Sequence, residues 1–326
     1  MNIYNIKIIG FFLLSVFLLA CSKEETSTLK NDVIKRTLAP AIVGQPIQFV
    51  YAMGATDGKV KKATVRASIV GDAGTGFDTK TYYYDVSKKL DVGIVVATCN
   101  TVSDLSTATI RDTTSVTLRY YYIVPESARG KSVSLTFTAE STTGEMVTYS
   151  QPAFQVQLMD MRSNIVLESG NRCYFSIADM AAYTESEVTT GNLSAKIDFV
   201  YNYKAKDLSG KYDYKHYFVS AASEATYLNG AVIPSGWTKN NTTMRPGYFD
   251  RDSQLINRSN FDGVFVTDVD MRAFSLVNCA NYSGTLINES NVIMKTADGK
   301  YMFYILINKV DDVNKKVTVS FKRLAI

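Results

Sequence analysis

Residues 132–139 read Ser-Val-Ser-Leu-Thr-Phe-Thr-Ala, with apolar side chains at every second position and polar ones between them. A period of two places alternate side chains on opposite faces of a strand, so that one face can be buried while the other meets solvent. Thr142-Thr143-Gly144-Glu145 then offers turn residues before another β-rich segment, residues 146–149. The pattern predicts an antiparallel hairpin in a sheet that is covered on one side.

Similar segments precede and follow this hairpin at short intervals. They are rich in β-branched and aromatic residues and are bounded by turn residues, and they comprise residues 43–51, 60–70, 79–86, 116–124 and 154–158. Seven to nine short strands spaced in this way are typical of an antiparallel sandwich. We therefore predict an immunoglobulin-like β-sandwich over residues 33–158.

A second set of strand-like segments begins after residues 158–162. It comprises residues 164–167, 173–177, 195–203, 216–220, 263–266, 301–307 and 316–323, the last two as a terminal hairpin. A short helical turn is expected near residues 177–183, with Ser176 as its cap. The polar, irregular stretch 228–262 is long enough to suggest a functional or disordered loop. We predict an all-β protein whose C-terminal domain, residues 159–326, is a second β-sandwich or jelly roll.

The first twenty residues contain one base, Lys7, followed by an apolar run over residues 8–19. This is the plan of a secretory signal peptide, and the run is shorter than the roughly 20 apolar residues that a bilayer requires. The next four-residue pattern, Leu18-Leu19-Ala20-Cys21, resembles the lipobox of bacterial lipoproteins, in which cleavage precedes a lipid-bearing cysteine. We expect residues 1–20 to be removed and Cys21 to carry the lipid.

Several acyl chains on one cysteine would hold the protein at a membrane without a spanning segment. Residues 21–32 are polar and aperiodic, which predicts a flexible tether. Within it, Ser22-Lys23-Glu24-Glu25 resembles the surface-export signal of Bacteroidetes lipoproteins. We expect an outer-membrane protein that faces outward; a periplasmic lipoprotein with an ordinary solvated linker is the alternative.

Charge and cysteine content constrain the partners and the redox chemistry. The formal net charge is +4, or +3 without Lys7, and the basic residues are scattered among acids. Nothing in that distribution predicts nucleic-acid binding. After Cys21 three cysteines remain, so an oxidising compartment permits one disulfide. If a pair forms, Cys173 with Cys279 is favoured because both belong to the C-terminal domain; two separate thiols are the alternative.

No catalytic or metal-binding motif stands out. The single histidine, His216, cannot supply a His-rich zinc site, and no Gly-x-Ser-x-Gly motif accompanies it. Acidic residues form three close pairs: Asp250 with Asp252, Asp268 with Asp270, and Asp311 with Asp312. The second pair would share one face of a strand, yet none has EF-hand spacing. We expect turn caps and ion pairs, no cofactor, no metal and no catalysis.

Aromatic content is the remaining signal: 21 Tyr, 16 Phe and one Trp. Trp237 follows a Pro-Ser-Gly turn and precedes amides and a carboxylate, the mixture that a glycan-binding site needs. The predicted ligand-binding residues are Trp237, Asn240, Asn241, Tyr248 and Asp250. A packing role for the indole of Trp237 is the alternative.

Several segments of the C-terminal half resemble an uncharacterised lipoprotein family of gut and oral Bacteroidetes. They are residues 170–177, 196–201, 249–255, 296–301 and 320–323. The resemblance implies a two-domain β lipoprotein of unknown function, in the company of glycan-uptake systems, and it transfers no catalytic residue. The lipid-tethered layout is also similar to that of starch-utilisation outer-membrane binding proteins, although a shared layout does not fix function.

These observations favour a lipid-anchored outer-membrane binding protein, without enzymatic activity, whose ligand is a glycan or a peptide. The first alternative is an adhesin or assembly component that binds another protein through sheet edges or loops. The second is a glycoside hydrolase or another hydrolase.

Overall fold

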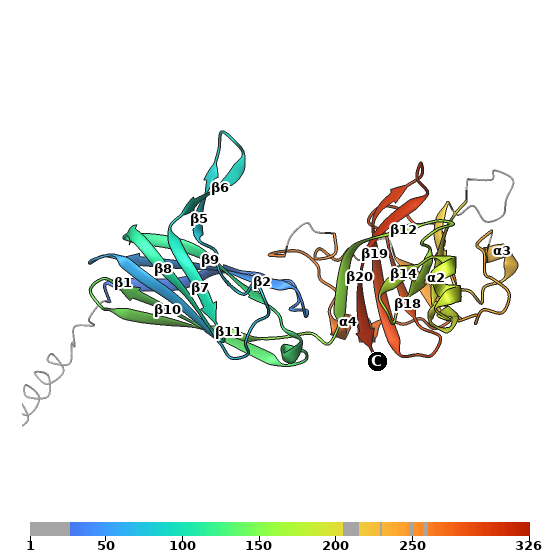
Figure 1. Ribbon diagram of the computed structural model, residues 1–326, viewed down its shortest axis with the longest axis horizontal. Coiled ribbons are helices and arrows are strands. Elements are labelled where there is room, and N and C mark those ends of the chain that lie inside the picture. The colour runs from blue at the N-terminus through green and yellow to red at the C-terminus, as the bar shows by residue number, and fades with distance from the viewer. Residues whose placement is uncertain (1–26, 205–214, 229, 248–250, 257–259) are drawn as a thin grey trace, which may run out of the picture.

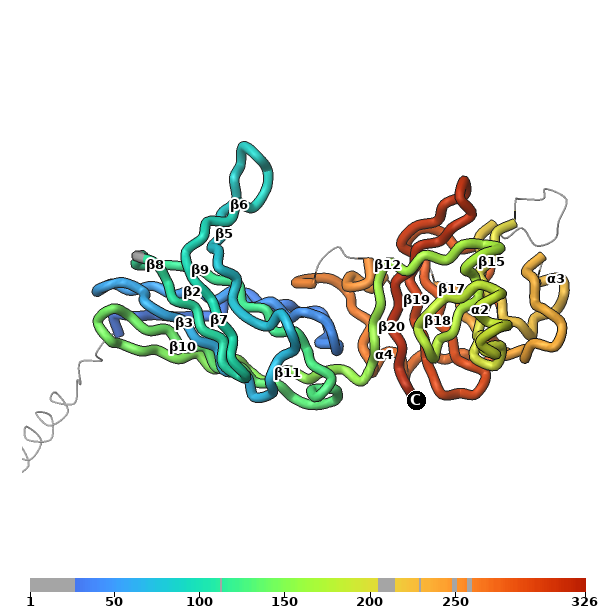
Figure 2. Tube along the Cα trace, in the orientation of Figure 1, coloured from blue at the N-terminus to red at the C-terminus, as the bar shows by residue number. Residues whose placement is uncertain are grey.

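The computed structural model describes residues 27–204, 215–228, 230–247, 251–256 and 260–326. The predicted signal peptide and the predicted lipidation site, Cys21, lie outside these residues. The described chain forms two β-rich domains that follow one another along the long axis of the molecule (Figure 1, Figure 2). No helix in this part of the chain is long and apolar enough to cross a membrane.

Two antiparallel sheets form the N-terminal domain, as predicted. One has the order β1 (Leu29–Arg36), β2 (Pro46–Ala55), β9 (Ser115–Ile123), β4 (Gly76–Phe77). The other has the order β11 (Met146–Gln155), β10 (Ser132–Ser141), β3 (Val60–Ala67), β8 (Leu105–Thr113), β7 (Ala97–Val102), and a 3-10 turn, η1 (Glu126–Ala128), precedes β10. The predicted alternation decides how β10 packs: Val133, Leu135 and Phe137 are buried. The Phe137 ring lies 5.7 Å from the ring of Phe49 on the opposite sheet.

Strand β1 begins inside the predicted tether of residues 21–32. Leu29 pairs with Ala55 at the far end of β2 and is fully buried. The backbone N–H of Leu29 also donates to the Glu145 carboxylate at 3.0 Å. These contacts order residues whose polar composition alone predicts a flexible segment.

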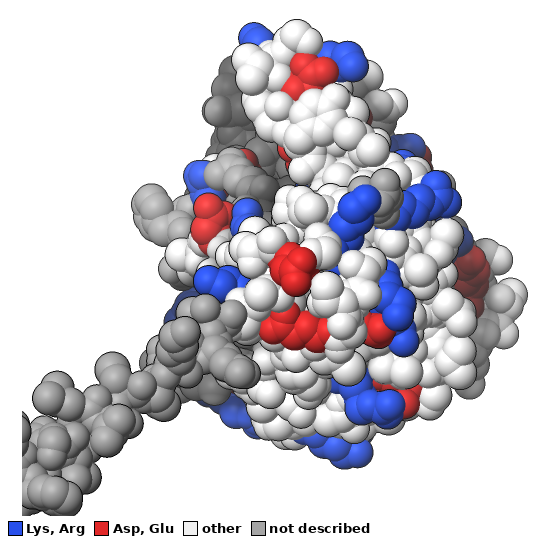
Figure 3. Space-filling view, turned by 90° about the vertical axis from the view of Figure 1, so that its left-hand side faces the viewer, with Lys and Arg blue, Asp and Glu red and all other residues white. Residues whose placement is uncertain are grey.

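A two-stranded hairpin, β5 (Lys80–Asp85) and β6 (Leu90–Val95), projects from the N-terminal domain (Figure 1). Arg119 of β9 anchors its base: the guanidinium lies 3.8 Å from the centre of the Tyr82 ring and 3.1 Å from the Asp91 carboxylate. Figure 3 shows acidic and basic side chains intermixed on this end of the molecule. The visible face therefore has no continuous patch of one sign.

The C-terminal domain is a second sandwich. Its larger sheet has the order β12 (Asp160–Glu168), β20 (Lys316–Ala325), β19 (Tyr301–Asp311), β18 (Asn291–Lys295), β17 (Thr243–Gly247). Its smaller sheet has the order β14 (Ala181–Tyr183), β13 (Tyr174–Ser176), β15 (Phe199–Tyr203), β16 (His216–Val219). Stacked phenylalanines fill the space between the sheets, with Phe175 and Phe199 4.9 Å apart. Short helices lie at the edges: α2 (Glu185–Thr190), η2 (Ser194–Lys196), α3 (Ala225–Leu228) and α4 (Asp268–Ala273).

Two predicted elements of this domain are wrong. Residues 177–183 were expected to form a helical turn, but they form a turn followed by β14. The Ser176 hydroxyl does accept the Asp179 N–H at 3.1 Å, as a cap would, yet no helix continues from it. The helix begins at Glu185, where Thr184 and Glu187 form a capping box. Residues 263–266 are not a strand, because the Val266 N–H donates to a side chain instead of a neighbouring strand.

That side chain is Asp252, which belongs to a buried ion pair on the outer face of the larger sheet. The Lys322 ammonium lies 2.6 Å from the Asp252 carboxylate and also donates to the carbonyl oxygen of Val266 at 2.9 Å. Neither charged side chain is exposed. Burial lowers the pKa of Lys322, and the Asp252 carboxylate opposes that shift. The pair fixes the chain at Asp252 and at Val266 against β20.

The two domains meet at residues that lie between Asp252 and Val266. The backbone N–H groups of Leu38 and Ala39 both donate to the carbonyl oxygen of Asn260, at 2.8 and 3.0 Å. Ile42 of the N-terminal domain packs into the apolar cluster that also contains Leu255 of the C-terminal domain. The residues of the C-terminal loop are thus part of the interface between the domains.

The three described cysteines are free thiols, so of the two alternatives left open for Cys173 and Cys279 the structure has the separate thiols and not the disulfide. Cys173 is buried in the core of the C-terminal domain, and burial raises the pKa of its thiol to about 11. Cys279 lies in the irregular segment before β18, where its thiol contacts the carbonyl oxygen of Val277 at 3.8 Å.

Candidate functional site

The predicted ligand-binding residues do not converge on one surface within the described chain. Trp237 is half-buried and packs edge-on against Tyr174, with the ring centres 4.9 Å apart. It therefore contributes to the core of the C-terminal domain. Tyr248 and Asp250 lie outside the described residues.

The two predicted asparagines use their amides inside the protein. Asn241 accepts a hydrogen bond from the Asn281 amide at 2.9 Å. The amide nitrogen of Asn240 donates to the carbonyl oxygens of Ala195 and Ile197, at 2.9 and 2.8 Å. Asn240 thereby fixes the chain that leads into β15, and with it the residue that follows Ile197.

That residue, Asp198, lines a hollow of about 300 Å³ at the edge of the sandwich. Segment 195–198 forms one side, and the turn between β18 and β19 forms the other. The polar and aromatic side chains around it are Lys196, Asp198, Asn240, Thr296, Asp298, Lys300 and Tyr301. Of the predicted site residues, Asn240 is the one that borders this hollow.

Asp198 is positioned by the strand pairing of the smaller sheet. Its backbone N–H donates to the carbonyl oxygen of Phe175 at 2.9 Å, and its side chain accepts the Ile177 N–H at 2.7 Å. The residue is 6% exposed. Within the described part of the chain, its second carboxyl oxygen has no hydrogen-bond partner. That oxygen is open to solvent in the hollow. A carboxyl that is held through one oxygen and offers the other as an acceptor is a candidate ligand-binding group.

Burial also changes the acidity of this carboxyl. Loss of solvation raises the pKa of Asp198 to about 7; the Ile177 N–H opposes this shift, and the carboxylates of Asp298 and Asp179 add to it. Asp298 shows the reverse behaviour. Hydrogen bonds from Thr296 and Lys300 lower the pKa of Asp298 to about 2. One hollow therefore contains a carboxyl that is easily protonated and a carboxylate that stays ionised.

The cations of the hollow have partners of their own. Lys196 pairs with Asp179 at 3.1 Å, and Lys300 pairs with Asp298 at 3.0 Å. Their charges and those of the two lining carboxyls nearly balance, so the hollow offers hydrogen-bond donors and acceptors with little net charge. The Tyr301 ring completes it and stacks on Arg323, whose guanidinium lies 5.0 Å from the ring centre.

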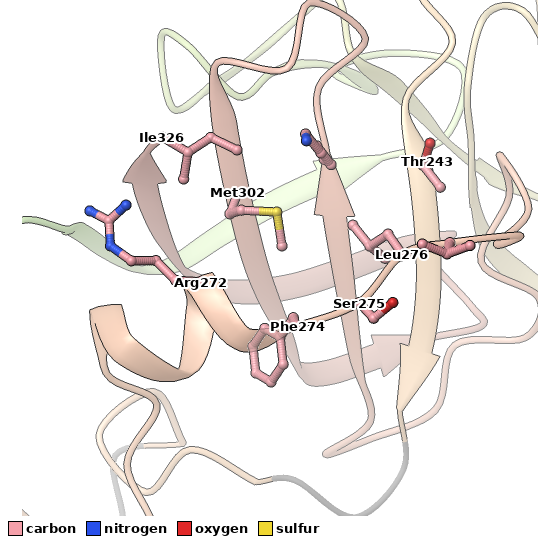
Figure 4. A pocket seen from close by; sticks show the side chains of 9 residues that line it. Thr243, Arg272, Phe274, Ser275, Leu276, Met302 and Ile326 are labelled. Carbon is pink, nitrogen blue, oxygen red and sulfur yellow. The ribbon is translucent and has the colours of Figure 1, made fainter.

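Two larger hollows lie in the same domain. One, of about 490 Å³, contains Asn202, whose amide already binds Tyr217 at 2.6 Å and Ser169 at 3.0 Å. The other, of about 590 Å³, lies on the outer face of the larger sheet beside Arg272 and Phe274 (Figure 4). The first is lined by hydroxyls, amides and the charged side chains of Glu185 and Lys315; the second differs from the Asp198 hollow in charge.

The acidic pairs of the sequence serve structural roles where they are described. Asp268 and Asp270 lie in the first turn of α4, not on a strand, and Asp270 forms a capping box with Thr267. Asp311 accepts the N–H groups of the turn after β19. Asp312 lies 2.7 Å from the buried His216, whose other ring nitrogen lies 2.7 Å from the Tyr201 hydroxyl. His216 is a sheet residue, as predicted.

Sequence reasoning missed Asp198, although a signal for it was present. Asp198 is a lone carboxyl inside the otherwise apolar run that leads into β15, residues 197–200. A charged residue flanked by core residues is uncommon unless it has a partner. Its other contacts come from residues 175 and 177 and from the turn at 296–301, which sequence proximity does not reveal.

Comparison with known proteins gives the family. Models of two domains of unknown function match the chain, DUF4466 over residues 26–156 and DUF8576 over residues 157–326. The crystal structure of a DUF4466 family protein from Parabacteroides merdae is 36% identical, with a TM-score of 0.82, and the match covers 92% of this chain and 99% of that chain. No curated protein matches.

Two distant structures share only parts of the fold. A family 123 glycoside hydrolase from Clostridium perfringens has a TM-score of 0.27 and 11% identity, over 40% of this chain and 27% of that chain. The collagen-binding subdomain of the Enterococcus faecalis surface protein ACE has a TM-score of 0.25 and 12% identity, over 41% and 99%. Neither carries an argument about function. The chain belongs to the DUF4466 family, and its C-terminal half is a DUF8576 domain.

Proposed function

We propose that this protein is a lipid-anchored binding protein of the outer membrane, facing outward, that holds a glycan in its C-terminal domain without transforming it. One observation carries the ligand assignment: the Asp198 carboxyl is buried, and one of its oxygens has no partner among the described residues of the hollow that it lines. The anchor rests on the predicted lipobox at residues 18–21.

The composition of the hollow favours uncharged sugar residues of the glycan. Sugar hydroxyls both donate and accept, and the hollow offers an acceptor in Asp198 and donors in Lys196 and Lys300. The half-buried Tyr301 ring lines the same hollow and supplies apolar surface against which the C–H groups of a sugar can pack. The volume of about 300 Å³ suits one or two residues of a longer chain.

Binding is favoured over hydrolysis by the state of the second carboxylate. Hydrolysis of a glycoside ordinarily needs two carboxyl groups that both reach the scissile bond. Asp298 is held in its turn by Thr296 and by the backbone and ammonium of Lys300. A hydrolase would have to release those bonds before Asp298 could act.

One observation supports a second candidate, an adhesin or assembly component. The β5–β6 hairpin exposes Tyr83, Leu90 and Ile94, which cross-strand pairing places on one face. An isolated two-stranded ribbon gains little stability from its own contacts, so an exposed apolar face on it is suited to a protein partner.

A glycan array followed by calorimetry tests the proposal. We expect the wild-type protein to bind neutral oligosaccharides, and Asp198→Asn to weaken binding by at least about tenfold, since a hydrogen bond to a charged group contributes roughly 1.5–3 kcal/mol. Asp57→Asn, an exposed carboxylate of the N-terminal domain, is the matched control and should bind as wild type.

The same titrations separate the competing sites and functions. If Trp237→Ala abolishes binding while Asp198→Asn does not, the ligand lies on the Trp237 loop and the proposed site is wrong. Turnover of any bound glycan that stops in Asp298→Asn would establish a hydrolase. Absence of any glycan signal, together with capture of one outer-membrane protein that Tyr83→Ser/Ile94→Ser prevents, would favour the adhesin.

A further inference from the structure

The outer face of the larger C-terminal sheet carries a hollow of about 590 Å³ that the proposed glycan site does not use (Figure 4). Its floor is a row of paired residues on neighbouring strands: Thr243 of β17 opposes Lys295 of β18, which opposes Met302 of β19. Directly opposed residues of antiparallel strands point to the same face. A basic side chain therefore stands between a hydroxyl and an apolar thioether.

The wall of this hollow is the segment that follows α4. Arg272 lies in the last turn of the helix, and Phe274 and Leu276 are half-buried beyond its end. Arg245 fixes the segment, because its guanidinium donates to the carbonyl oxygen of Ser275 at 2.9 Å and lies 5.6 Å from the centre of the Phe274 ring. Figure 4 shows Arg272, Phe274 and Leu276 arranged around Met302.

Charge distinguishes this hollow from the one at Asp198. Among the described residues that line it, the charged side chains are those of Arg272 and Lys295; both are basic and exposed, and none of these residues is acidic. Within the described ranges neither cation forms an ion pair. In the Asp198 hollow, by contrast, each lysine is paired with an aspartate. Charge complementarity thus selects a ligand that carries negative charge.

We infer that this second hollow binds the carboxylate of an acidic sugar, a uronic acid unit of the glycan. The carboxylate would accept charge-assisted hydrogen bonds from Arg272 and Lys295. The apolar face of the sugar ring would pack against Phe274 and Leu276, and its hydroxyls would meet the hydroxyl of Thr243. An alkyl chain fits less well, since it would desolvate that hydroxyl without replacing its hydrogen bonds.

The inference rests on the proposed glycan-binding function but uses different residues. Strand geometry places the two hollows on opposite faces of one hairpin: Lys295 and Met302 line one, and their chain neighbours Thr296 and Tyr301 line the other. Substitutions in one hollow can therefore be made without altering side chains of the other.

Calorimetric titration of the full mature protein at low salt tests the inference, with trigalacturonate and its uncharged methyl ester as probes. We expect the acid to bind at least tenfold more tightly than the ester, and the preference to shrink as salt screens the charges. Arg272→Gln/Lys295→Gln should remove the preference. Arg162→Gln/Lys309→Gln removes the same charges from exposed positions of the same sheet and should retain it.

Three outcomes would overturn the inference. Equal affinity for the acid and the ester would exclude a carboxylate site. Unchanged affinity for the acid in Arg272→Gln/Lys295→Gln would place the site elsewhere. Loss of acid binding in Asp198→Asn, with the double variant unaffected, would assign the acidic sugar to the other hollow. Failure of the proposed function is distinct, because neutral oligosaccharides would then bind neither the wild type nor the double variant.

Discussion

The two domains are both β-sandwiches, yet they differ in the polar and ionisable side chains that they bury. Among the described residues of the N-terminal domain, the fully buried polar side chains are uncharged. The C-terminal domain buries Asp198, His216, Asp252 and Lys322. Burying a charge costs free energy unless the charge has partners. The described core of the N-terminal domain is thus free of buried charged side chains, whereas the C-terminal domain carries polar groups that packing alone does not need.

The four buried groups also differ from one another. Asp252 and Lys322 satisfy each other, and Asp252 additionally accepts the N–H groups of Gln254, Leu255 and Val266. Asp198 satisfies one oxygen through Ile177 and leaves the other facing a hollow. The pair is thus a structural device that pins the interdomain loop, and Asp198 is the candidate for binding.

The largest expected effect follows from breaking the structural pair. Asp252→Ala leaves the Lys322 ammonium buried without a counter-charge, so we expect the free energy of unfolding to fall by about 3–5 kcal/mol. Urea denaturation measures this. Glu140→Ala is the matched control: its partner Lys61 is exposed, and the loss should stay below about 1 kcal/mol. Equal losses in the two variants would remove the distinction between the domains.

The next largest expected effect is an increase in the free energy of unfolding, caused by a substitution of Asp198. The pKa of Asp198 is about 7 in the folded protein against an ordinary value of 3.8, so its contribution to stability is fully present below pH 4 and is lost as the pH rises to about 7. Asp198→Asn removes this loss, and at pH 8 we expect it to stabilise the C-terminal domain by up to about 4 kcal/mol.

Thermal unfolding between pH 4 and pH 8 checks this sign. The charged groups near Asp198 are Asp179, Lys196, Asp298, Lys300 and Arg323. The pKa of Asp298, about 2, places its titration below this window. A variant that is less stable than wild type at pH 8 would show that Asp198 stabilises the fold, and the argument for a binding role would lose its basis.

The smallest expected effect is the difference in stability loss between two substitutions that each remove one tyrosine hydroxyl. Tyr201 binds the His216 ring inside the C-terminal domain, and Tyr122 donates to the carbonyl oxygen of Ile69 in the N-terminal domain. We expect Tyr201→Phe to cost about 1–3 kcal/mol, because a buried ring nitrogen loses its partner, and Tyr122→Phe about 1 kcal/mol. Chemical denaturation of both variants gives the difference. A larger loss in Tyr122→Phe would contradict the contrast between the domains.

The sandwich folds could be predicted from the sequence, because the alternation of apolar and polar residues within a single strand indicates which side chains are buried. Alternation in residues 132–139 reports directly on which side chains of β10 are buried. Residues 263–266 are β-rich in composition, but the backbone of Val266 binds the side chains of Asp252, 14 residues earlier, and Lys322, 56 residues later. Local pattern cannot report such partners, and the predicted strand there was wrong for that reason.

The candidate site was predicted less well. Trp237 and Asn240 drew attention because sugar-binding sites use indoles and amides, yet the indole packs on Tyr174 and the amide holds the backbone before Asp198. A composition argument identifies suitable side chains but not whether the fold leaves them free. Asn240 nevertheless borders the hollow that we propose as the binding site, and its amide holds the backbone on which Asp198 lies.

The most direct measurement is a carbon-13 NMR titration of the Asp198 carboxyl, with and without a neutral oligosaccharide found on the array. The account predicts a pKa of about 7 in the free protein and a displaced pKa when the sugar occupies the hollow. An ordinary value near 3.8 that the sugar leaves unchanged would mean that this carboxyl is solvated and takes no part in binding.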